Sequence, residues 1–444
     1  MYELTALFCR YLFIFYIFYF LFHSVCYILI ERGTLKGSLV LALSKQRLAV
    51  IFMHLTAFLL LSYRQGSLLF DIQSLVIGAG GLVFLLFAFV ATDKLQGKSC
   101  PALWNCVFFL ADTGLFMLLR LNKDSAMRQL IWIFMGYGCA LALPCILKLA
   151  PKLEKLDKLY IGLSYGLILL PFLIGIENGG SVNWISLGPI TMQPSEIVKI
   201  TYVLFLAAVF RKKPSIKEVC ISGALCGGIV LALTLQRDLG GALIFCIAFI
   251  LLAYLATGKE YIFLAGFGGA ALASVTAYAR FSHVKVRVAA WQNPWADVSG
   301  SGYQIAQSLF AIGTWGAFGS GLGLGYPNKV PVVENDFIFA AICEELGSLF
   351  GAGLIILVAV ALYRAFYIGA KAKSRFYALA ACGLACVFGI QSFLILGGVI
   401  KMIPLTGVTL PFVCYGGSSM VTSFVTIGLI QWIYGQSKGK ARHE

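Results

Sequence analysis

Ionisable side chains inside otherwise apolar stretches are the residues of this sequence that could do chemistry. Glu196 and Lys199 lie in the segment QPSEIVK, Asp238 lies in LQRDLGG, and Asp336 begins the segment DFIFAAICEELG. Charged residues within membrane-spanning segments are costly and usually functional. A carboxylate in such a setting could act as a general base, and a lysine could bind an anion such as phosphate.

Each of these groups also has a structural interpretation. Glu196 and Lys199 are three residues apart, so they could form a buried ion pair on one face of a helix. Asp238 follows Arg237 and could cap the next helix, and Asp336 could be the N-cap of the helix that it precedes. In the functional alternative, Asp336 meets the head group of a lipid-linked substrate as a general base. The residue types alone leave both alternatives open.

Three other features carry weaker functional signals. Glu344 and Glu345 would lie about 12 Å deeper along a helix that starts at Asp336, and we interpret them as part of a structural network with a lysine or backbone donors. The glycines from Gly319 to Gly325 lack the strand and helix context of a dinucleotide-binding loop. The four histidines are widely separated and the thirteen cysteines contain no C-x-x-C, so we predict no metal cluster and no disulfide.

The composition predicts the elements that must position these residues. Hydrophobic residues make up 60% of the 444 and charged residues only 12%, whereas soluble domains have about 45–50% and about 25%. This excludes a disordered chain, a secreted disulfide scaffold and an ordinary soluble enzyme. It predicts an all-α, polytopic transmembrane bundle. We attribute the net charge of +15 to cytoplasmic loops and expect no nucleic-acid partner.

Apolar runs predict about thirteen membrane spans, since each span needs about 20 mainly apolar residues. The runs are 9–30, 48–63, 73–92, 101–121, 129–149, 157–175, 194–210, 219–235, 239–257, 260–280, 336–363, 376–400 and 410–435. Lys and Arg on alternate connections differ about two to one, which predicts an extracytoplasmic N-terminus and a cytoplasmic C-terminus.

This orientation places two distinctive connections outside the membrane. Residues 176–193 form a short, nearly uncharged loop, and residues 281–335 form one long loop. The long loop carries Trp291 and Trp295 and is apolar enough that we expect it to fold onto the membrane surface. Between the last two spans, residues 397–420 contain prolines and glycines, which is typical of irregular backbone that lines a cavity.

Five ordered motifs resemble the SEDS family of bacterial elongation, division and sporulation proteins, which includes RodA, FtsW and SpoVE. The matching stretches are NWISLGPITMQPSEIVK, LQRDLGGAL, GYQIAQSLFAIGTWGAFGSGLGLG, NDFIFAAICEELG and IPLTGVTLPFVCYGGSS. The resemblance implies a ten-helix catalytic core over residues 101–437. Three additional N-terminal spans would then occupy residues 1–100, and a cytoplasmic basic tail residues 438–444.

The resemblance implies a glycosyltransferase that polymerises lipid II into glycan strands on the outer face of the cytoplasmic membrane. Asp336 would be its catalytic residue, taking a proton from the acceptor hydroxyl as undecaprenyl diphosphate leaves with inversion. Lys285, Arg287 or a divalent cation such as Mg²⁺ or Mn²⁺ would stabilise the leaving diphosphate. The substrate-binding residues that we expect are Trp184, Ser195, Glu196, Lys199, Asp238, Gln304, Lys329, Lys401 and Ser418.

The family also implies a protein partner, a class B penicillin-binding protein with transpeptidase activity. Two alternatives remain beside the enzyme, a lipid II flippase and a non-catalytic scaffold for the transpeptidase. The sequence departs from the family in its outer motifs. Val182 and Asn183 stand where the family often has two arginines, and QRDLG and ENDF replace the usual QPDLG and HTDF.

Overall fold

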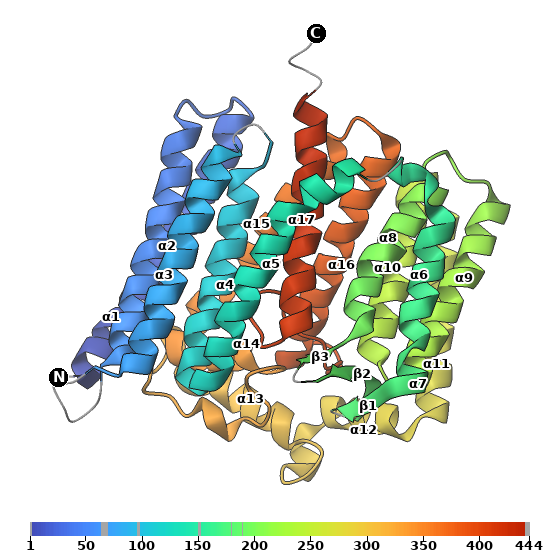
Figure 1. Ribbon diagram of the computed structural model, residues 1–444. Helices are drawn as coiled ribbons and strands as arrows, with labels where there is room; N and C mark the ends of the chain where they lie inside the picture. Colours follow the sequence, from blue (N-terminus) through green and yellow to red (C-terminus); the bar gives the residue numbers. More distant parts are fainter. Residues whose placement is uncertain are drawn as a thin grey trace.

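A computed structural model describes residues 2–63, 70–95, 98–149, 152–178, 180–188 and 190–439. Long helices form a bundle, and a small sheet and short helices gather at one end of it (Figure 1). The long helices are α1 (Tyr2–Glu31), α2 (Leu39–Ser62), α3 (Ile72–Lys94), α4 (Pro101–Leu121), α5 (Lys123–Leu149), α6 (Asp157–Leu169), α8 (Pro194–Val209), α9 (Ile216–Leu235), α10 (Leu239–Thr257), α11 (Glu260–Arg280), α15 (Ser348–Ala370), α16 (Arg375–Val399) and α17 (Gly417–Gly439). The shorter elements are α7 (Pro171–Ile174), α12 (Ser282–Gln292), α13 (Tyr303–Thr314), α14 (Ile338–Leu346) and strands β1 (Gly175–Asn178), β2 (Ser181–Leu187) and β3 (Ile190–Met192).

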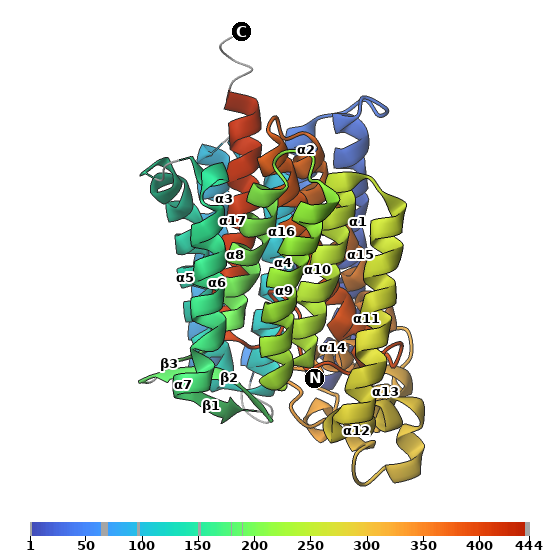
Figure 2. The same cartoon turned by 90° about the vertical axis from the view of Figure 1, so that its right-hand side faces the viewer.

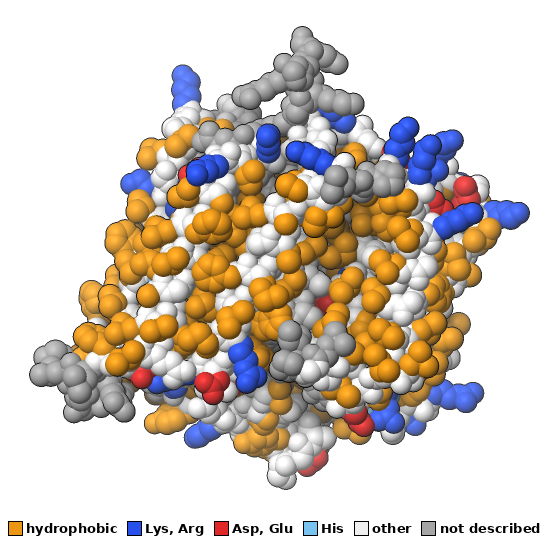
Figure 3. All heavy atoms as spheres, viewed as in Figure 1, with side chains coloured by type: hydrophobic (Ala, Val, Ile, Leu, Met, Phe, Trp, Pro, Cys, Tyr) orange, Lys and Arg blue, Asp and Glu red, His pale blue; other side chains and the backbone are white. Residues whose placement is uncertain are grey.

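The surface of the bundle has the pattern of a membrane protein. Hydrophobic side chains cover its flank, while Lys and Arg gather at its two ends (Figure 3). The described N-terminal residues lie at the end that carries the sheet and α12–α14, and α17 leads to the opposite end (Figure 1). We refer to the end with the sheet as the site end of the bundle.

Eleven helices in the described ranges are long and apolar enough to cross a membrane. The predicted multi-span helical fold is therefore confirmed, whereas the count of about thirteen stays a prediction. Helix α8 has only 16 residues and includes Glu196 and Lys199, and it is not among the eleven.

Two expected spans have different bounds in the structure. The run 336–363 is divided at Gly347, where φ is +92°, into the short helix α14 and the long helix α15. The run 410–435 becomes helical only at Gly417, because the proline- and glycine-containing segment before it is irregular. Both breaks place non-helical backbone at the site end.

The first helices are longer than their apolar runs. Helix α2 begins at Leu39 and not at residue 48, because its polar residues have partners inside the bundle. Gln46 Nε2 donates to Ser24 of α1, and its Oε1 accepts from Asn105 of α4. Arg47 pairs with Asp93 of α3 at 2.7 Å.

The connections at the site end contain regular structure that we did not predict. Strands β1, β2 and β3 form an antiparallel sheet in the order β1-β2-β3, with Trp184 opposite Ile176 and Ile185 opposite Met192. The long connection 281–335 contains α12, α13 and short 3-10 turns that lie across the end of the bundle (Figure 2).

Helix α4 is the central element of the N-terminal half, and all its residues from Ala102 to Leu119 are buried. Helices α2 and α3 pack against it, and α1 packs against α2 and α15. The boundary that we predict at residue 100 falls between α3 and α4 and stays a prediction. Of the expected tail 438–444, residues 440–444 lie outside the described ranges.

Candidate functional site

A cavity of about 710 Å³, lined by both polar and apolar residues, opens at the site end of the bundle. It is surrounded by strands β2 and β3, the start of α8, the start of α10 and the irregular segment before α17. One wall is formed by α5, and α12 contributes Arg287. The segments that break the helical pattern are thus the ones that line the cavity, which agrees with the rule that irregular backbone at membrane depth borders protein or water.

Of the two cations that we expected at the leaving diphosphate, Arg287 lines the cavity and Lys285 does not. Of the ten residues that we expected to be catalytic or to bind the substrate, the cavity brings together seven. These are Trp184, Ser195, Glu196, Lys199, Asp238, Asp336 and Ser418. The other three do not line it. Gln304 lies on α13, the Lys329 ammonium stacks over the Tyr326 ring, and Lys401 lies in the turn after α16, where its carbonyl accepts from Trp291.

Asp336 precedes α14 and faces the cavity without a side-chain partner among the described residues. It is not the N-cap of α14, because Phe337 occupies that position and no side chain caps the helix. A Cβ atom placed on Gly407 would lie 3.9 Å from both Asp336 Oδ2 and Arg287 Nη2, so the two charged groups flank the same glycine. Burial raises the pKa of Asp336 to about 6, although Arg287 acts to lower it.

The residues just before Asp336 are held in place by hydrogen bonds, some of them to neighbouring elements. Ser125 of α5 donates to Glu334 Oε2 at 2.6 Å, and the Tyr415 N–H donates to the Glu334 carbonyl at 3.0 Å. The Asp336 N–H donates to the Val332 carbonyl at 3.2 Å. The carboxylate is therefore held at the cavity wall by backbone contacts and keeps both oxygens available.

Asp238 is the N-cap of α10, as its position after Arg237 suggested. Its Oδ1 accepts from the Gly241 N–H at 2.7 Å. Its Oδ2 accepts from Asn183 of β2 at 2.7 Å and from Gln193 at 3.2 Å. Asn183 is only 2% exposed, and its side-chain oxygen has no hydrogen-bond partner among the described residues. Strand β2 thus carries a hydrogen-bond acceptor at the cavity wall that no described residue uses.

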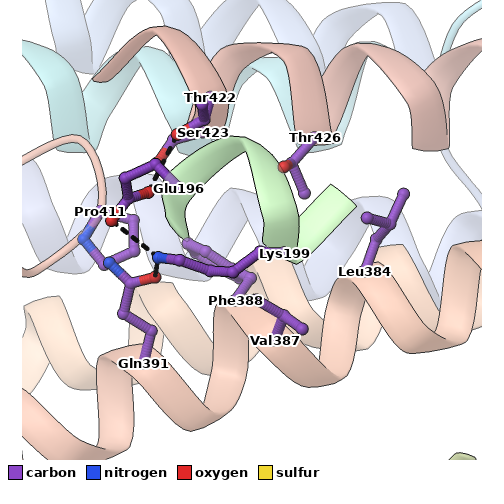
Figure 4. A pocket seen from close by; sticks show the side chains of 10 residues that line it. All are labelled: Glu196, Lys199, Leu384, Val387, Phe388, Gln391, Pro411, Thr422, Ser423 and Thr426. Carbon is purple, nitrogen blue, oxygen red and sulfur yellow. Dashed lines mark hydrogen bonds and ion pairs between the residues drawn. The ribbon is translucent and has the colours of Figure 1, made fainter. Parts of the chain in front are cut away.

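Glu196 and Lys199 form the predicted ion pair, with Lys199 Nζ 2.8 Å from Glu196 Oε1 (Figure 4). Lys199 also donates to Gln391 of α16 at 2.7 Å, and Thr422 of α17 donates to Glu196 Oε2 at 3.0 Å. Both charged residues are less than a tenth exposed. The pair lines the cavity and also borders a second, small pocket between α16 and α17, which has polar and apolar lining residues.

Glu344 and Glu345 lie outside the cavity and have structural partners. Arg120 of α4 donates to Glu345 Oε1 at 2.9 Å. The Gly323 N–H donates to Glu345 Oε2, and the Tyr326 N–H donates to Glu344 Oε1. The network that we predicted is present, with an arginine where we expected a lysine.

Several cavity residues escaped sequence reasoning. Arg128 and Trp132 lie on α5, Arg128 just before and Trp132 inside the run 129–149 that we interpreted only as a span. Arg237 and Asn335 lie beside residues that we did select. The side-chain oxygen of Asn335 is buried and has no hydrogen-bond partner in the described part of the chain. The spacing of Arg128 and Trp132, four residues apart, was the available signal, because it puts both side chains on one helix face.

The sequence of the chain is similar to those of known proteins. A family model for FtsW, RodA and SpoVE, described as cell cycle protein, matches residues 118–439. The peptidoglycan glycosyltransferase RodA of Mycobacterium tuberculosis is 32% identical over 385 residues, which cover 79% of this chain and 81% of the relative. Stage V sporulation protein E of Bacillus subtilis is 34% identical over 273 residues, 60% of this chain and 74% of the relative.

Solved structures share the fold. A chain from a peptidoglycan synthase complex, studied for the coordination of polymerization and crosslinking, is 26% identical with a TM-score of 0.67, over 76% of this chain and 98% of that one. The rod shape determining protein RodA of Thermus thermophilus gives a TM-score of 0.57 at 24% identity, over 76% of this chain and 96% of that one. In both comparisons about a quarter of this chain has no counterpart.

Proposed function

Since the chain belongs to the FtsW/RodA/SpoVE family, we propose that it is a peptidoglycan glycosyltransferase that polymerises lipid II at the outer face of the cytoplasmic membrane. The names of its curated relatives support this class of activity. The observation that carries the proposal is the setting of Asp336, a half-buried carboxylate at the cavity wall whose oxygens make no hydrogen bond or ion pair with the described residues.

Asp336 has the properties of a general base in this proposal. A base is most effective when its pKa lies near the working pH, and burial brings the pKa of Asp336 to about 6. The carboxylate takes the proton of the acceptor hydroxyl as that oxygen attacks the anomeric carbon of the donor. The bond from that carbon to the diphosphate breaks with inversion, and the polyprenyl diphosphate leaves.

Cations at the cavity wall suit the charge of the leaving diphosphate. Arg287 lies near Asp336, and Arg128 lies on the α5 wall without an ion-pair partner among the described residues. One guanidinium group can bind two phosphate oxygens at once through two parallel N–H donors. Because Lys199 already bonds Glu196 and Gln391, we assign the diphosphate first to Arg287 and Arg128.

The cavity also suits a substrate that is partly in the bilayer. Ile131 and Met135 of α5 line the cavity and are 53% and 47% exposed. The surface is hollowed between α5 and α6 on the face shown in Figure 3. We infer that the polyprenyl chain stays in the lipid beside α5 while the head group enters the cavity.

A divalent cation is a further proposal. In the described part of the chain, no three His, Cys, Asp or Glu side chains lie together as a metal site. Mg²⁺ is commonly held by one or two carboxylates and substrate phosphates, so Asp336 and the unpartnered Asn335 oxygen could serve with the diphosphate. When bound, such an ion would neutralise charge on the leaving group.

The protein partner that we propose is a class B penicillin-binding protein, because one structural neighbour comes from a peptidoglycan synthase complex. The decisive experiment uses the purified full chain with this partner and labelled lipid II. We expect Asp336→Asn to reduce glycan polymer by at least about 10²-fold, the usual contribution of a general base. Asp297→Asn is the matched control, since Asp297 lies in the same long connection, is exposed, and has hydrogen-bond partners, Ser301 and Gly300, in that connection.

Polymer at the native rate from Asp336→Asn would contradict the catalytic assignment and favour the scaffold. A native protein that moves lipid II between leaflets but never polymerises it would favour the flippase. The ionisable cavity residues of α8 and α10 favour the enzyme over the flippase, because they lie within or just before the first two turns of these helices, at one end of the bundle.

A further inference from the structure

Helix α1 belongs to the N-terminal part of the chain that precedes the family match, yet it touches the segment beside the reaction centre. Arg10 Nη1 donates to the Gly319 carbonyl at 3.0 Å, and the Tyr2 hydroxyl donates to the Leu322 carbonyl at 3.3 Å. Between these contacts, Ala6 is fully buried against Gly321. One face of the first two turns of α1 therefore lies on residues 316–326, which we call the glycine segment.

The glycine segment has a conformation that depends on close backbone approach. Gly319, Gly321 and Gly323 have φ values of +74°, +101° and +87°, which side chains rarely adopt. A Cβ atom on Gly321 would lie 3.1 Å from the Ala6 carbonyl oxygen, and one on Gly323 would lie 2.1 Å from the Tyr2 hydroxyl. The segment is thus shaped to fit directly against α1.

The other side of the glycine segment holds the C-terminal end of α14. The Ser320 and Gly321 N–H groups donate to the carbonyls of Glu344 and Glu345, both at 2.9 Å. The side chain of Glu345 accepts from the Gly323 N–H at 2.9 Å. Helix α1 and α14 are therefore joined by a single layer of backbone.

Helix α14 connects this layer to Asp336. All nine of its residues, Ile338–Leu346, are buried. Packed interiors are stiff and transmit displacements, so a shift at Glu345 moves the N-terminal end of α14 and the carboxylate just before it. The contacts form a continuous path from Arg10 through the glycine segment and α14 to Asp336.

We propose that α1 is a positioning element of the reaction centre, holding the glycine segment through Arg10 and Tyr2 so that α14 places Asp336 at the cavity. This role rests on the proposed function. It gives the N-terminal helices a part in the reaction beyond membrane anchoring.

The test measures lipid II polymerisation by the full chain with its transpeptidase partner in Arg10→Ala, Arg10→Lys and Arg32→Ala. We expect Arg10→Ala to lower kcat by about 10- to 100-fold, as small misplacements of catalytic groups do, with KM unchanged. Arg10→Lys restores activity because an ammonium can still donate to the Gly319 carbonyl. Arg32 lies at the opposite end of α1 and is exposed, bonding Tyr363, so Arg32→Ala keeps native activity.

Two further measurements separate positioning from general stability. Loosening of α14 admits water around Asp336, which faces Arg287 of α12 and Cys414 before α17, so in Arg10→Ala the acid limb of the rate moves to lower pH. Hydrogen exchange of the amides of Ser320, Gly321 and Gly323 also rises in this variant. A rate that falls only with the amount of folded protein, at an unchanged acid limb, would overturn the proposal.

Native kcat and native exchange in Arg10→Ala would overturn it as well. If Asp336→Asn polymerises lipid II as the native chain does, the proposed function is wrong and the reaction role of α1 is wrong with it. The exchange measurement does not depend on catalysis. It would then still show whether α1 holds the glycine segment, so the two failures are distinguishable.

Discussion

Asp336 shows how burial can turn an ordinary carboxyl group into a useful base. Its pKa is raised to about 6 by burial, against the opposing effect of Arg287. The carboxylate must be unprotonated to accept a proton, so polymerisation should be retained above pH 6 and lost as the pH falls through about 6. The acid limb of kcat/KM, measured with labelled lipid II between pH 4.5 and 8, roughly the range over which such a group titrates, checks this expectation.

Replacement of Arg287 should move that limb in a defined direction. The guanidinium favours the charged form of Asp336, so Arg287→Gln raises the pKa and shifts the acid limb to higher pH. The variant should also lose activity at every pH if Arg287 binds the diphosphate. Arg280→Gln is the control, because Arg280 is an exposed cation at the same end of the bundle and does not line the cavity. A downward shift, or none, in Arg287→Gln would contradict the assignment.

The pair of Glu196 and Lys199 illustrates how two interpretations of one motif can both have structural support. The ion pair exists, and its remaining hydrogen bonds join α8 to α16 and α17. Both residues nevertheless line the cavity. Removing one partner of a buried pair commonly costs about 3–5 kcal/mol of stability, so loss of activity in a single variant of this pair does not by itself identify a substrate contact.

At the scale of elements, the break between α14 and α15 determines the direction of α14 and therefore the position of Asp336. Gly347 has φ +92° and ψ 157°, and a Cβ atom there would lie 2.3 Å from the Ala317 carbonyl oxygen. Gly347→Ala should therefore cost at least about 1–3 kcal/mol through backbone strain and should reduce polymerisation by tilting α14. Thermal unfolding in detergent and polymer yield measure the two effects.

Gly268→Ala is the matched control for this prediction. Gly268 lies in α11, and nothing is within 4 Å of the position that its Cβ would take. Alanine is favoured over glycine inside a helix, so this variant should keep native stability and activity. Equal melting temperatures for Gly347→Ala and the native protein would show that the segment can adopt another conformation without cost.

At the scale of the whole molecule, the structure divides the lysines between two ends of the bundle. Lys285 and Lys329 are exposed at the site end, whereas Lys213 and Lys371 are exposed on connections at the opposite end. If the site end is extracytoplasmic, an amine reagent that does not cross membranes should modify the first pair in intact cells. It should modify the second pair only after the cells are opened. Mass spectrometry of the native protein makes this comparison, and the reverse pattern would exclude an extracytoplasmic site.

The membrane class and the positions of most helices could be predicted from local properties of the chain. Apolar runs specify helices because every backbone polar group in lipid must be satisfied within its own segment. The predicted bounds and elements were wrong where tertiary contacts, and not apolar runs, determine the structure. Helix α2 extends over residues 39–47 because Gln46 finds partners on two other helices, and the sheet forms at the end of the bundle, where chain segments can pair with one another.

By itself the sequence determined the family, the polytopic helical class and the candidate carboxylate, because these follow from residue types and the order of motifs. Only the tertiary structure decided which candidates meet, since Arg128, Asn183, Arg287 and Asp336 are distant in the chain and are gathered by the bundle into one cavity. It also showed that Gln304, Lys329 and Lys401 lie elsewhere. The raised pKa of Asp336 and the contact between α1 and the glycine segment arise from packing, which no local pattern encodes.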